Sequence, residues 1–342
     1  MTHWIPPSDW LRITTIDAHA EGEPLRIVLE GFPELAGATI LEKRRSAQEH
    51  FDHLRRLLMF EPRGHADMYG CLLTEPVTDD GDVGVLFVHN EGFSTMCGHG
   101  IIGLVAVAAT TGLLSDAVGR GAVRIDTPAG RVTAKPHMAG GGIDRVTFQN
   151  VPSFVLTSDL IVPVDGIGDV RCDVAFGGAF YAFVSAPDLG VDLVPAETER
   201  ITELGRRISA AVSASMDIAH PSGDVDLGFL YGTIFVGPPR AEGSHSRNVC
   251  VFADGEVDRS PTGTGVSGRA AIHHARGELG VGEQIVVESI LGTTFSVEVV
   301  GETRVGPHQA VIPEVGGRAW ITGRHEFLLD PGDPLSAGFL LR

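Results

Sequence analysis

The sequence predicts two similar α/β domains that face each other, because its two halves repeat the same order of elements. A glycine pattern, G-x-G-x-x-G, occurs at 98–103 and again at 263–268, half a chain apart. Each copy follows a run rich in β-branched and aromatic residues, VGVLFVHNEG (83–92) and RNVCVFADGE (247–256). Patterns that recur at a fixed spacing indicate repeated structural units. We therefore expect the two glycine loops at matched edges of the two domains.

The other elements of each half correspond in the same order. One amphipathic helix precedes each loop. Its apolar face is formed in the first half by Phe51, Leu54 and Leu58, and in the second by Ile201, Leu204, Ile208 and Val212. Helix-like segments follow the loops at 101–114 and 266–279. Strand–turn–strand units then follow at 123–135 and 285–299, so each half contains the same set of elements.

The two halves join near 150–154, where Pro152 interrupts a strand-like run. A chain of 342 residues is long for one ordinary domain and suits two. We predict an N-terminal domain at 1–150, which carries the first glycine loop. A C-terminal domain at 151–320 carries the second.

The composition excludes several classes of protein. A formal charge of −18, with no basic cluster longer than EKRR (42–45), is unsuited to binding a phosphate backbone. The N-terminus lacks the pattern of a signal peptide, and no apolar run reaches the roughly 18–20 residues that span a bilayer. The four cysteines are scattered, without a C-x-x-C pair, at positions Cys71, Cys97, Cys172 and Cys250. These features predict a cytoplasmic protein with reduced thiols and without nucleic-acid or membrane partners.

The glycine loops first suggest a dinucleotide site. In that fold the first glycine follows its strand almost directly, and an acidic residue stands about 20 positions further on. Glu288 and Asp126 stand at similar places after the two loops. However, the strand expected at 248–253 ends well before Gly263, and Cys97 occupies the tight turn of the first copy. Cofactor binding is therefore a poorer match than the two interpretations that follow.

A purely structural interpretation is that both loops only start buried helices. The glycines would allow close packing, and Cys97 would be a small buried apolar residue. The position of Cys97 argues for a functional role, because Cys97 directly precedes the free N–H groups of a helix start and His99 follows two residues later. A helix N-terminus favours the thiolate and lowers a thiol pKa from about 8.5 toward neutrality. This placement predicts that Cys97 acts as a base.

The catalytic interpretation uses both loops together. Unpaired N–H groups at Gly98, His99, Gly263 and Thr264 would point out of two facing helix N-termini. They would hold one small carboxylate and stabilise the negative charge that develops when its Cα proton leaves. Such a site requires no metal and no prosthetic group, so we predict no cofactor.

The motifs around the loops resemble those of the proline racemase family. The paired segments are MCGHG (96–100) and DRSPTGTG (258–265), and the supporting stretches are IDAHAEGEPLRIV (16–28), RGHADMYG (63–70), GGAFYAFV (177–184) and RNVCVFADGE (247–256). The resemblance covers nearly the whole chain. It implies the diaminopimelate-epimerase-like fold, with two pseudo-symmetric domains that each wrap a barrel-like sheet around a central helix and an active site in the cleft between them. It also implies that 321–342 returns to the first domain, and it allows a homodimer, which is common in the family.

The resemblance also implies roles for individual residues. Racemases and epimerases of the family carry a cysteine on each loop, but this chain has Thr262 at the second position. The Cys/Thr pair is similar to that of the family's trans-3-hydroxy-L-proline dehydratases. It implies that the Cys97 thiolate removes the Cα proton, that water leaves from Cβ, and that the product is Δ1-pyrroline-2-carboxylate. Asp258 should meet the ring nitrogen of the substrate, a cyclic imino acid, while Thr262 binds the substrate or assists the departing hydroxyl.

Three alternatives remain open at this stage. The chain could be a racemase or epimerase of the same family, or an amino-acid-binding protein without turnover. His245, just upstream of the second loop, either lines the pocket or lies on a surface loop. The histidine pairs His50/His53 and His273/His274 lack the further ligands of a zinc site, so we expect them to face solvent.

Overall fold

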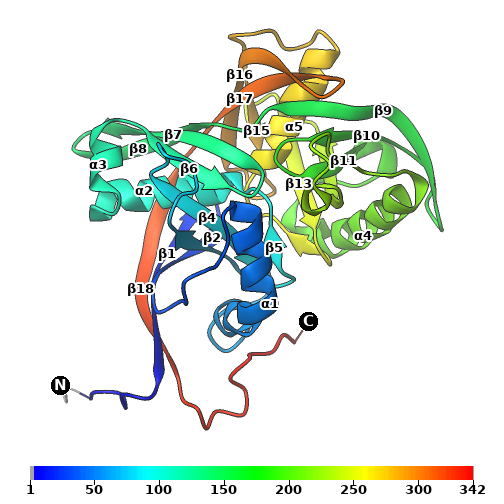
Figure 1. The fold of residues 1–342 in the computed structure, drawn as a ribbon. Helices are drawn as coiled ribbons and strands as arrows, with labels where there is room; N and C mark the ends of the chain where they lie inside the picture. The colour runs from blue at the N-terminus through cyan, green and yellow to red at the C-terminus, as the bar shows by residue number, and fades with distance from the viewer. Residues whose placement is uncertain (1–3, 342) are drawn as a thin grey trace.

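The computed structural model describes residues 4–341 and contains two lobes, each built from a sheet that curls around one helix (Figure 1). This confirms the predicted fold class. The α-helices are α1 (Ile40–Met59), α2 (Gly98–Thr111), α3 (Ser115–Gly119), α4 (Thr198–Ser215) and α5 (Gly263–Ala275). Three short 3₁₀ turns are η1 (Pro187–Leu189), η2 (Pro195–Glu197) and η3 (Val225–Leu227).

The strands of the N-terminal lobe form one curled sheet. They are β1 (Leu11–Ala20), β2 (Glu23–Glu30), β3 (Tyr69–Thr74), β4 (Val83–His89), the short β5 (Phe93–Ser94), β6 (Val123–Thr127), β7 (Gly130–Ala139) and β8 (Gly142–Gln149). Neighbours pair in the order β1–β2–β3–β4–β6–β7–β8, with β2–β3 and β4–β6 parallel and the others antiparallel. The two parallel steps are those where α1 and α2 intervene in the sequence, as parallel pairs require a crossover.

The C-terminal lobe repeats this arrangement. Its strands are β9 (Ser153–Val164), β10 (Gly168–Phe176), β11 (Phe180–Ser185), β12 (Leu230–Gly237), β13 (Ser246–Phe252), the short β14 (Glu256–Val257), β15 (Gln284–Glu288), β16 (Thr294–Val305) and β17 (His308–Gly317). The order is β9–β10–β11–β12–β13–β15–β16–β17, with β11–β12 and β13–β15 parallel. Because β17 also pairs with β9, the sheet closes into a barrel.

The end of the chain closes the first barrel as well. The last residues of β17 pair with β8, and after Arg318 the chain continues as β18 (Ala319–Leu329). β18 lies antiparallel beside β1 along its whole length (Figure 1). A nearly continuous run of strand therefore belongs to both lobes. The boundaries at 150 and 320 stay a prediction, because the lobes share this segment.

The helices α2 and α5 fill the two barrels. Every residue of α2 from Gly98 to Ala108 is buried, as is every residue of α5 from Gly263 to Ile272. A helix that is apolar on all sides, such as α2, is stable only inside a core. α5 also carries buried polar side chains, including Arg269. Both helices begin at the first glycine of the loop, three residues earlier than the segments predicted from the sequence. The glycine loops are therefore the first turns of the helices themselves.

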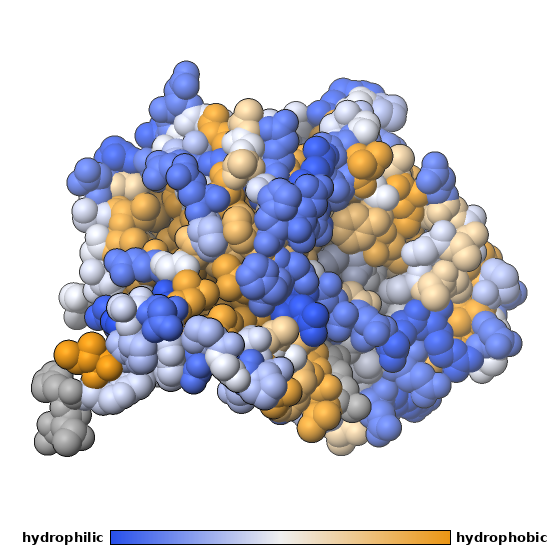
Figure 2. All heavy atoms as spheres, turned by 60° about the horizontal axis from the view of Figure 1, so that its bottom comes forward, coloured by the Kyte–Doolittle hydropathy of each residue, from blue (hydrophilic) through white to orange (hydrophobic). Residues whose placement is uncertain are grey.

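The helices α1 and α4 cover the outside of the sheets. Their predicted apolar faces are confirmed, since Leu54, Leu58, Ile201, Ile208 and Val212 are buried. Thr39 and Glu42 form a capping box at the start of α1, which satisfies two backbone N–H groups that a helix start leaves free. Hydrophilic side chains are spread over the face shown in Figure 2. In residues 4–341 we find no helix long and apolar enough to cross a membrane.

The N-termini of α2 and α5 meet at two glycines. A Cβ atom added to Gly263 would lie 2.5 Å from the Cα atom of Gly98, and the converse holds for Gly98. Backbone therefore touches backbone, which only glycine allows at this separation. The two helix starts approach closely enough to enclose a very small ligand between them.

Replacing Gly263 with alanine is expected to force the two helix starts apart. Overpacking of a tight core costs about 1–3 kcal/mol, so the free energy of unfolding, measured with urea, should fall by that amount. Gly119 is a matched control, because a Cβ there would meet nothing within 4 Å. Equal stability of Gly263→Ala and Gly119→Ala would contradict the contact.

Candidate active site

One small cavity between the lobes collects the residues predicted for the site. It has a volume of about 20 Å³. Its lining includes all seven predicted residues, Cys97, Gly98, His99, Asp258, Thr262, Gly263 and Thr264. It also includes Tyr69, Met96, Tyr181, Tyr231 and Phe252. This volume suits a water molecule rather than an amino acid, so a substrate can enter only when the lobes separate.

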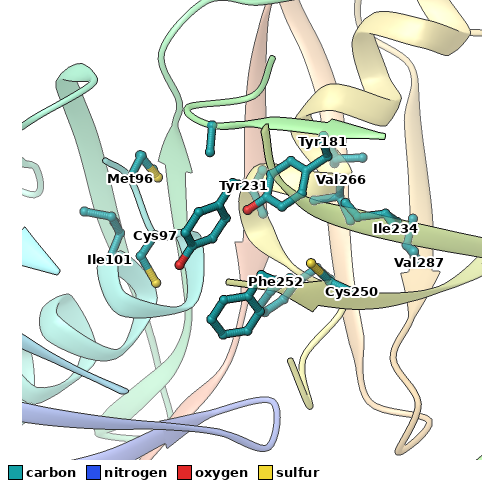
Figure 3. Close-up of a cluster of buried hydrophobic side chains, with 14 of the residues drawn as sticks. Met96, Cys97, Ile101, Tyr181, Tyr231, Ile234, Cys250, Phe252, Val266 and Val287 are labelled. Atoms are coloured by element: carbon teal, nitrogen blue, oxygen red, sulfur yellow. The ribbon is translucent and has the colours of Figure 1, made fainter. Parts of the chain in front are cut away.

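Cys97 stands at the N-cap position of α2. Its Sγ accepts a hydrogen bond from the backbone N–H of Gly100 at 3.2 Å and lies 3.1 Å from Nδ1 of His99. The thiol is 5% exposed and faces the aromatic side chains of the opposite lobe (Figure 3). The chain thus places a nucleophilic sulfur at the positive end of a helix.

The predicted lowering of the Cys97 pKa is wrong for this closed arrangement. Burial raises the pKa of the thiol well above its ordinary value. The Gly100 N–H and the Tyr69 hydroxyl lower it, while the negative charges of Asp258 and Glu23 add to the increase. The sequence revealed the helix start but not the loss of water around the sulfur, which outweighs it.

His99 is a neutral side chain in this site. Burial, with a further contribution from the positive charge of Arg259, lowers its pKa to about 3. An uncharged imidazole 3.1 Å from Sγ can donate or accept one hydrogen bond but supplies no positive charge to a thiolate. The helix start and the nearby charge of Arg259 are then left as sources of positive potential.

Thr262 differs from Cys97 in backbone as well as in side chain. It stands at the N-cap of α5 with φ +67° and ψ +98°, whereas Cys97 has φ −145° and ψ +110°. Positive φ is rare for a β-branched residue and occurs where surrounding structure enforces it, often at functional sites. Its buried Oγ1 makes no hydrogen bond of good geometry among residues 4–341, but the hydroxyl is close enough to Asp258 and Cys250 to act against the rise in their pKa values. Because Thr262 lines the cavity, its hydroxyl can also contact a ligand there.

Asp258 is a buried carboxyl group just before the second loop. It accepts a hydrogen bond from the backbone N–H of Ser260 at 2.7 Å. Burial raises its pKa, and the Ser260 hydrogen bonds oppose that increase. A buried carboxylate is stable when a cation pairs with it. Asp258 can therefore receive the ammonium group of a ligand.

All three tyrosines of the chain line the cavity, although they are far apart in sequence. Tyr181 and Thr264 share a hydrogen bond of 2.7 Å between their hydroxyls. The buried Tyr231 hydroxyl makes no hydrogen bond of good geometry within the described residues, although Ser94 and Tyr69 are near enough to act against the rise in its pKa. Tyr69 and Tyr181 appear in segments that carry the family resemblance, but Tyr231 lies in an ordinary apolar strand, and no sequence signal singles it out.

Among the buried polar contacts that join the lobes, two involve charged or titratable side chains beside the cavity. His89 Nδ1 lies 2.9 Å from Oε1 of Glu256. Arg259 donates its backbone N–H to Oε2 of Glu23 at 2.7 Å, and its Nε lies 3.1 Å from the same oxygen. Both contacts join the N-terminal to the C-terminal lobe. They could not be found from sequence, because the partners are distant and share no motif.

Other candidate residues lie elsewhere. His245 contacts Ser246 and the ring of His273, and it is not among the residues that line the cavity. Cys71, Cys172 and Cys250 are buried in strands. His50 and His53 are exposed, but His273 and His274 are half-buried, because each packs against the residues that follow α5. The described residues contain no cluster suited to a metal ion.

Two pseudo-symmetric barrels with facing helix starts, one of them bearing a thiol, define the class of epimerase-like α/β proteins. A hydroxyproline epimerase from Agrobacterium vitis, solved with bound trans-4-hydroxy-L-proline, has a similar structure. The TM-score is 0.91 at 29% identity, over 98% of this chain and 96% of that chain. A family model described as Proline racemase matches residues 15–340. The chain belongs to the proline racemase family.

Relatives of the chain carry two different names. A trans-3-hydroxy-L-proline dehydratase from Colwellia psychrerythraea is 47% identical, over 99% of this chain and 95% of its own. A 3-hydroxyproline 2-epimerase from Burkholderia multivorans is 45% identical, over 96% of this chain and 98% of its own. Overall identity therefore does not separate the two activities, and the residues of the site must do so.

Proposed function

We propose that this protein dehydrates trans-3-hydroxy-L-proline to Δ1-pyrroline-2-carboxylate without a cofactor. The observation that carries the proposal is the asymmetry of the cavity, with a thiol at one helix start and a threonine at the other. Two-base inversion needs an acid and a base on opposite faces of Cα. A threonine hydroxyl does not ionise near neutral pH, so the second face lacks such a group. Elimination needs only one base at Cα.

The substrate would be held by its two charged groups. Its carboxylate would accept hydrogen bonds from N–H groups of Gly98, His99, Gly263 and Thr264 at the two helix starts. Its ring ammonium would pair with Asp258, which is buried and lies in the same cavity. This pairing also offsets the negative charge that contributes to the raised pKa of Cys97. Binding of the substrate would thus favour the thiolate that reacts with it.

The proton and the hydroxyl group that leave as water both come from the substrate. The Cys97 thiolate takes the Cα proton, and the electron pair of that bond forms a double bond to Cβ as the C–O bond breaks. The departing hydroxide takes up one proton and leaves as water, which restores the thiolate when that proton comes from Sγ. Thr262 lines the same cavity, and its Oγ1 would form a hydrogen bond with the leaving oxygen. The enamine then tautomerises to the cyclic imine.

The purified protein should be incubated with trans-3-hydroxy-L-proline and the product identified. A pyrroline that reacts with o-aminobenzaldehyde is expected, with one water lost per substrate. Inversion at Cα of 3- or 4-hydroxyproline, or of proline, without loss of water would favour an epimerase or racemase instead. Binding with neither reaction would indicate an amino-acid-binding protein.

The raised thiol pKa predicts an alkaline pH profile. A base with a raised pKa is protonated at neutral pH, and its thiolate fraction increases as the pH rises through that pKa. Because kcat/KM reports groups of the free enzyme, kcat/KM should still be increasing at pH 9. A plateau already reached near pH 7 would show that the free enzyme holds Cys97 as a thiolate.

The proposal extends to the ligand, the partners and the cellular location of the protein. We propose a small cyclic imino acid as the ligand and no nucleic-acid or membrane partner, with a homodimer as the form common in the family. All four cysteines are free thiols, which supports a cytoplasmic location.

A further inference from the structure

A second cavity lies in the C-terminal lobe, beside the C-terminal half of α5. It has a volume of about 330 Å³. It shares no residue with the small cavity between the lobes that contains Cys97, called the catalytic cavity below. Its apolar walls come from β10, β11, β12 and α5, and include Cys172, Phe183, Val184, Val236 and Ile272. This volume falls at the lower end of the range for small-molecule sites. The cavity is thus large enough for a compact ligand.

The floor of this cavity carries a buried guanidinium. Arg269, on α5, is 4% exposed. Its Nη1 donates to Ser246 Oγ and to Asn248 Oδ1, and its Nη2 lies 2.8 Å from Nε2 of His273. These contacts use three of the five N–H donors of an arginine. All three partners are neutral groups, so the positive charge of Arg269 is not offset by them.

His273 must be an acceptor toward Arg269. An arginine only donates, so Nε2 of His273 carries no proton and Nδ1 carries one. That Nδ1 lies 2.6 Å from Oε2 of Glu278, to which it donates. Glu278 therefore makes no direct hydrogen bond to Arg269, although its negative charge acts on the guanidinium from the far side of the ring. Burial, together with the charge of Arg269, lowers the pKa of His273 and keeps it neutral.

The other arginines around the cavity are paired. Arg276 lies 2.8 Å from Asp173, and Arg171 lies 3.3 Å from Asp159. Among residues 4–341, no carboxylate oxygen lies within 4.0 Å of Arg269. A buried charge without a counter-charge is costly, and arginine binds a carboxylate better than any neutral partner. Arg269 is therefore a suitable partner for the carboxylate of a ligand.

We propose that this cavity binds a small monocarboxylate with a compact apolar body. The carboxylate would accept hydrogen bonds from the two remaining donors of Arg269, while the apolar walls would contact the body. Asp159, Asp173 and the exposed Asp188 line the same cavity and disfavour a ligand with a second negative charge. The proposal is independent of the reaction assigned to the catalytic cavity.

The position of the cavity couples it to the catalytic site. Arg269 lies on the helix whose first residues are Gly263 and Thr264. Phe183 lies on β11 two residues after Tyr181, which hydrogen-bonds Thr264. A ligand held by Arg269 would therefore contact α5 and β11. These two elements position Gly263 and Thr264, which are proposed to bind the carboxylate of the substrate. This arrangement is suited to an effector site.

The test is calorimetric titration of the full-length protein with 4-bromobenzoate, a monocarboxylate of suitable size. We expect binding that its uncharged analogue, 4-bromobenzamide, does not reproduce. A crystal soaked with 4-bromobenzoate should place the anomalous bromine signal in the cavity of Arg269. No binding in solution, or a signal confined to the catalytic cavity, would overturn the proposal.

Two variants test separately whether binding requires the charge of Arg269 and the open volume of the cavity. Arg269→Gln removes the charge, and Val236→Trp fills the cavity while it leaves Arg269 and its hydrogen bonds in place. Each should weaken 4-bromobenzoate binding at least about 10-fold, the effect of losing roughly 1.4 kcal/mol. Val236→Trp should keep the catalytic activity of the parent protein. Unchanged affinity in Val236→Trp would show that the ligand binds elsewhere.

Discussion

Replacing Cys97 with serine is expected to lower kcat by about 10²–10⁴-fold, the usual contribution of a positioned general base. The change swaps one sulfur for one oxygen, and an alcohol is a far weaker acid than a thiol, so no useful concentration of alkoxide forms near neutral pH. Serine is also a good N-cap residue. The start of α2 and the stability of the fold should therefore survive the loss of activity.

The measurement is the steady-state rate of water loss from trans-3-hydroxy-L-proline. Unfolding in urea, carried out in parallel, verifies that the variant is folded. Cys172→Ala is the matched control, because Cys172 is a buried thiol in β10, outside the catalytic cavity, and its loss should leave kcat unchanged. A Cys97→Ser protein with near-normal kcat would remove Cys97 from its role as the base.

The sequence was sufficient to predict the repeat and the matched positions of the two glycine loops. Hydrophobic runs and glycine spacing are local properties, and they revealed two similar units with matched helix starts. All seven predicted site residues line one cavity, because both loops begin the central helices of the barrels. Only the exact start of each helix was misplaced, since the glycines belong to the first turn.

The electrostatics of the site could not be predicted from sequence. The thiol pKa depends on the balance between the helix start and burial, and burial appears only when the second lobe covers Cys97. The contact between His89 and Glu256 likewise joins residues from different lobes. Tyr231 reaches the cavity from a strand whose sequence is typical of any core. These features arise from packing at long sequence separation, which motifs do not record.

Replacing Thr262 with cysteine is expected to give the protein measurable inversion at Cα. The new thiol would stand at the start of α5, opposite Cys97, and could deliver a proton to the second face of the carbanion. Cysteine is not β-branched, so the positive φ of position 262 should cost it no more than threonine. Dehydration should fall, because the hydroxyl proposed to assist the leaving group is lost.

The substrate for this test is trans-4-hydroxy-L-proline, which lacks a hydroxyl at C3 and cannot follow the same elimination. Chiral chromatography should detect the Cα-inverted product from Thr262→Cys, at a rate at least about 10²-fold above the parent protein. Thr262→Ser is the matched control, because it keeps a hydroxyl without adding a thiol and should give no inversion. If Thr262→Cys binds the substrate and inverts none, side chains beyond position 262 must separate the two activities. The tyrosines, which line the cavity together with Thr262, would then be the next residues to exchange.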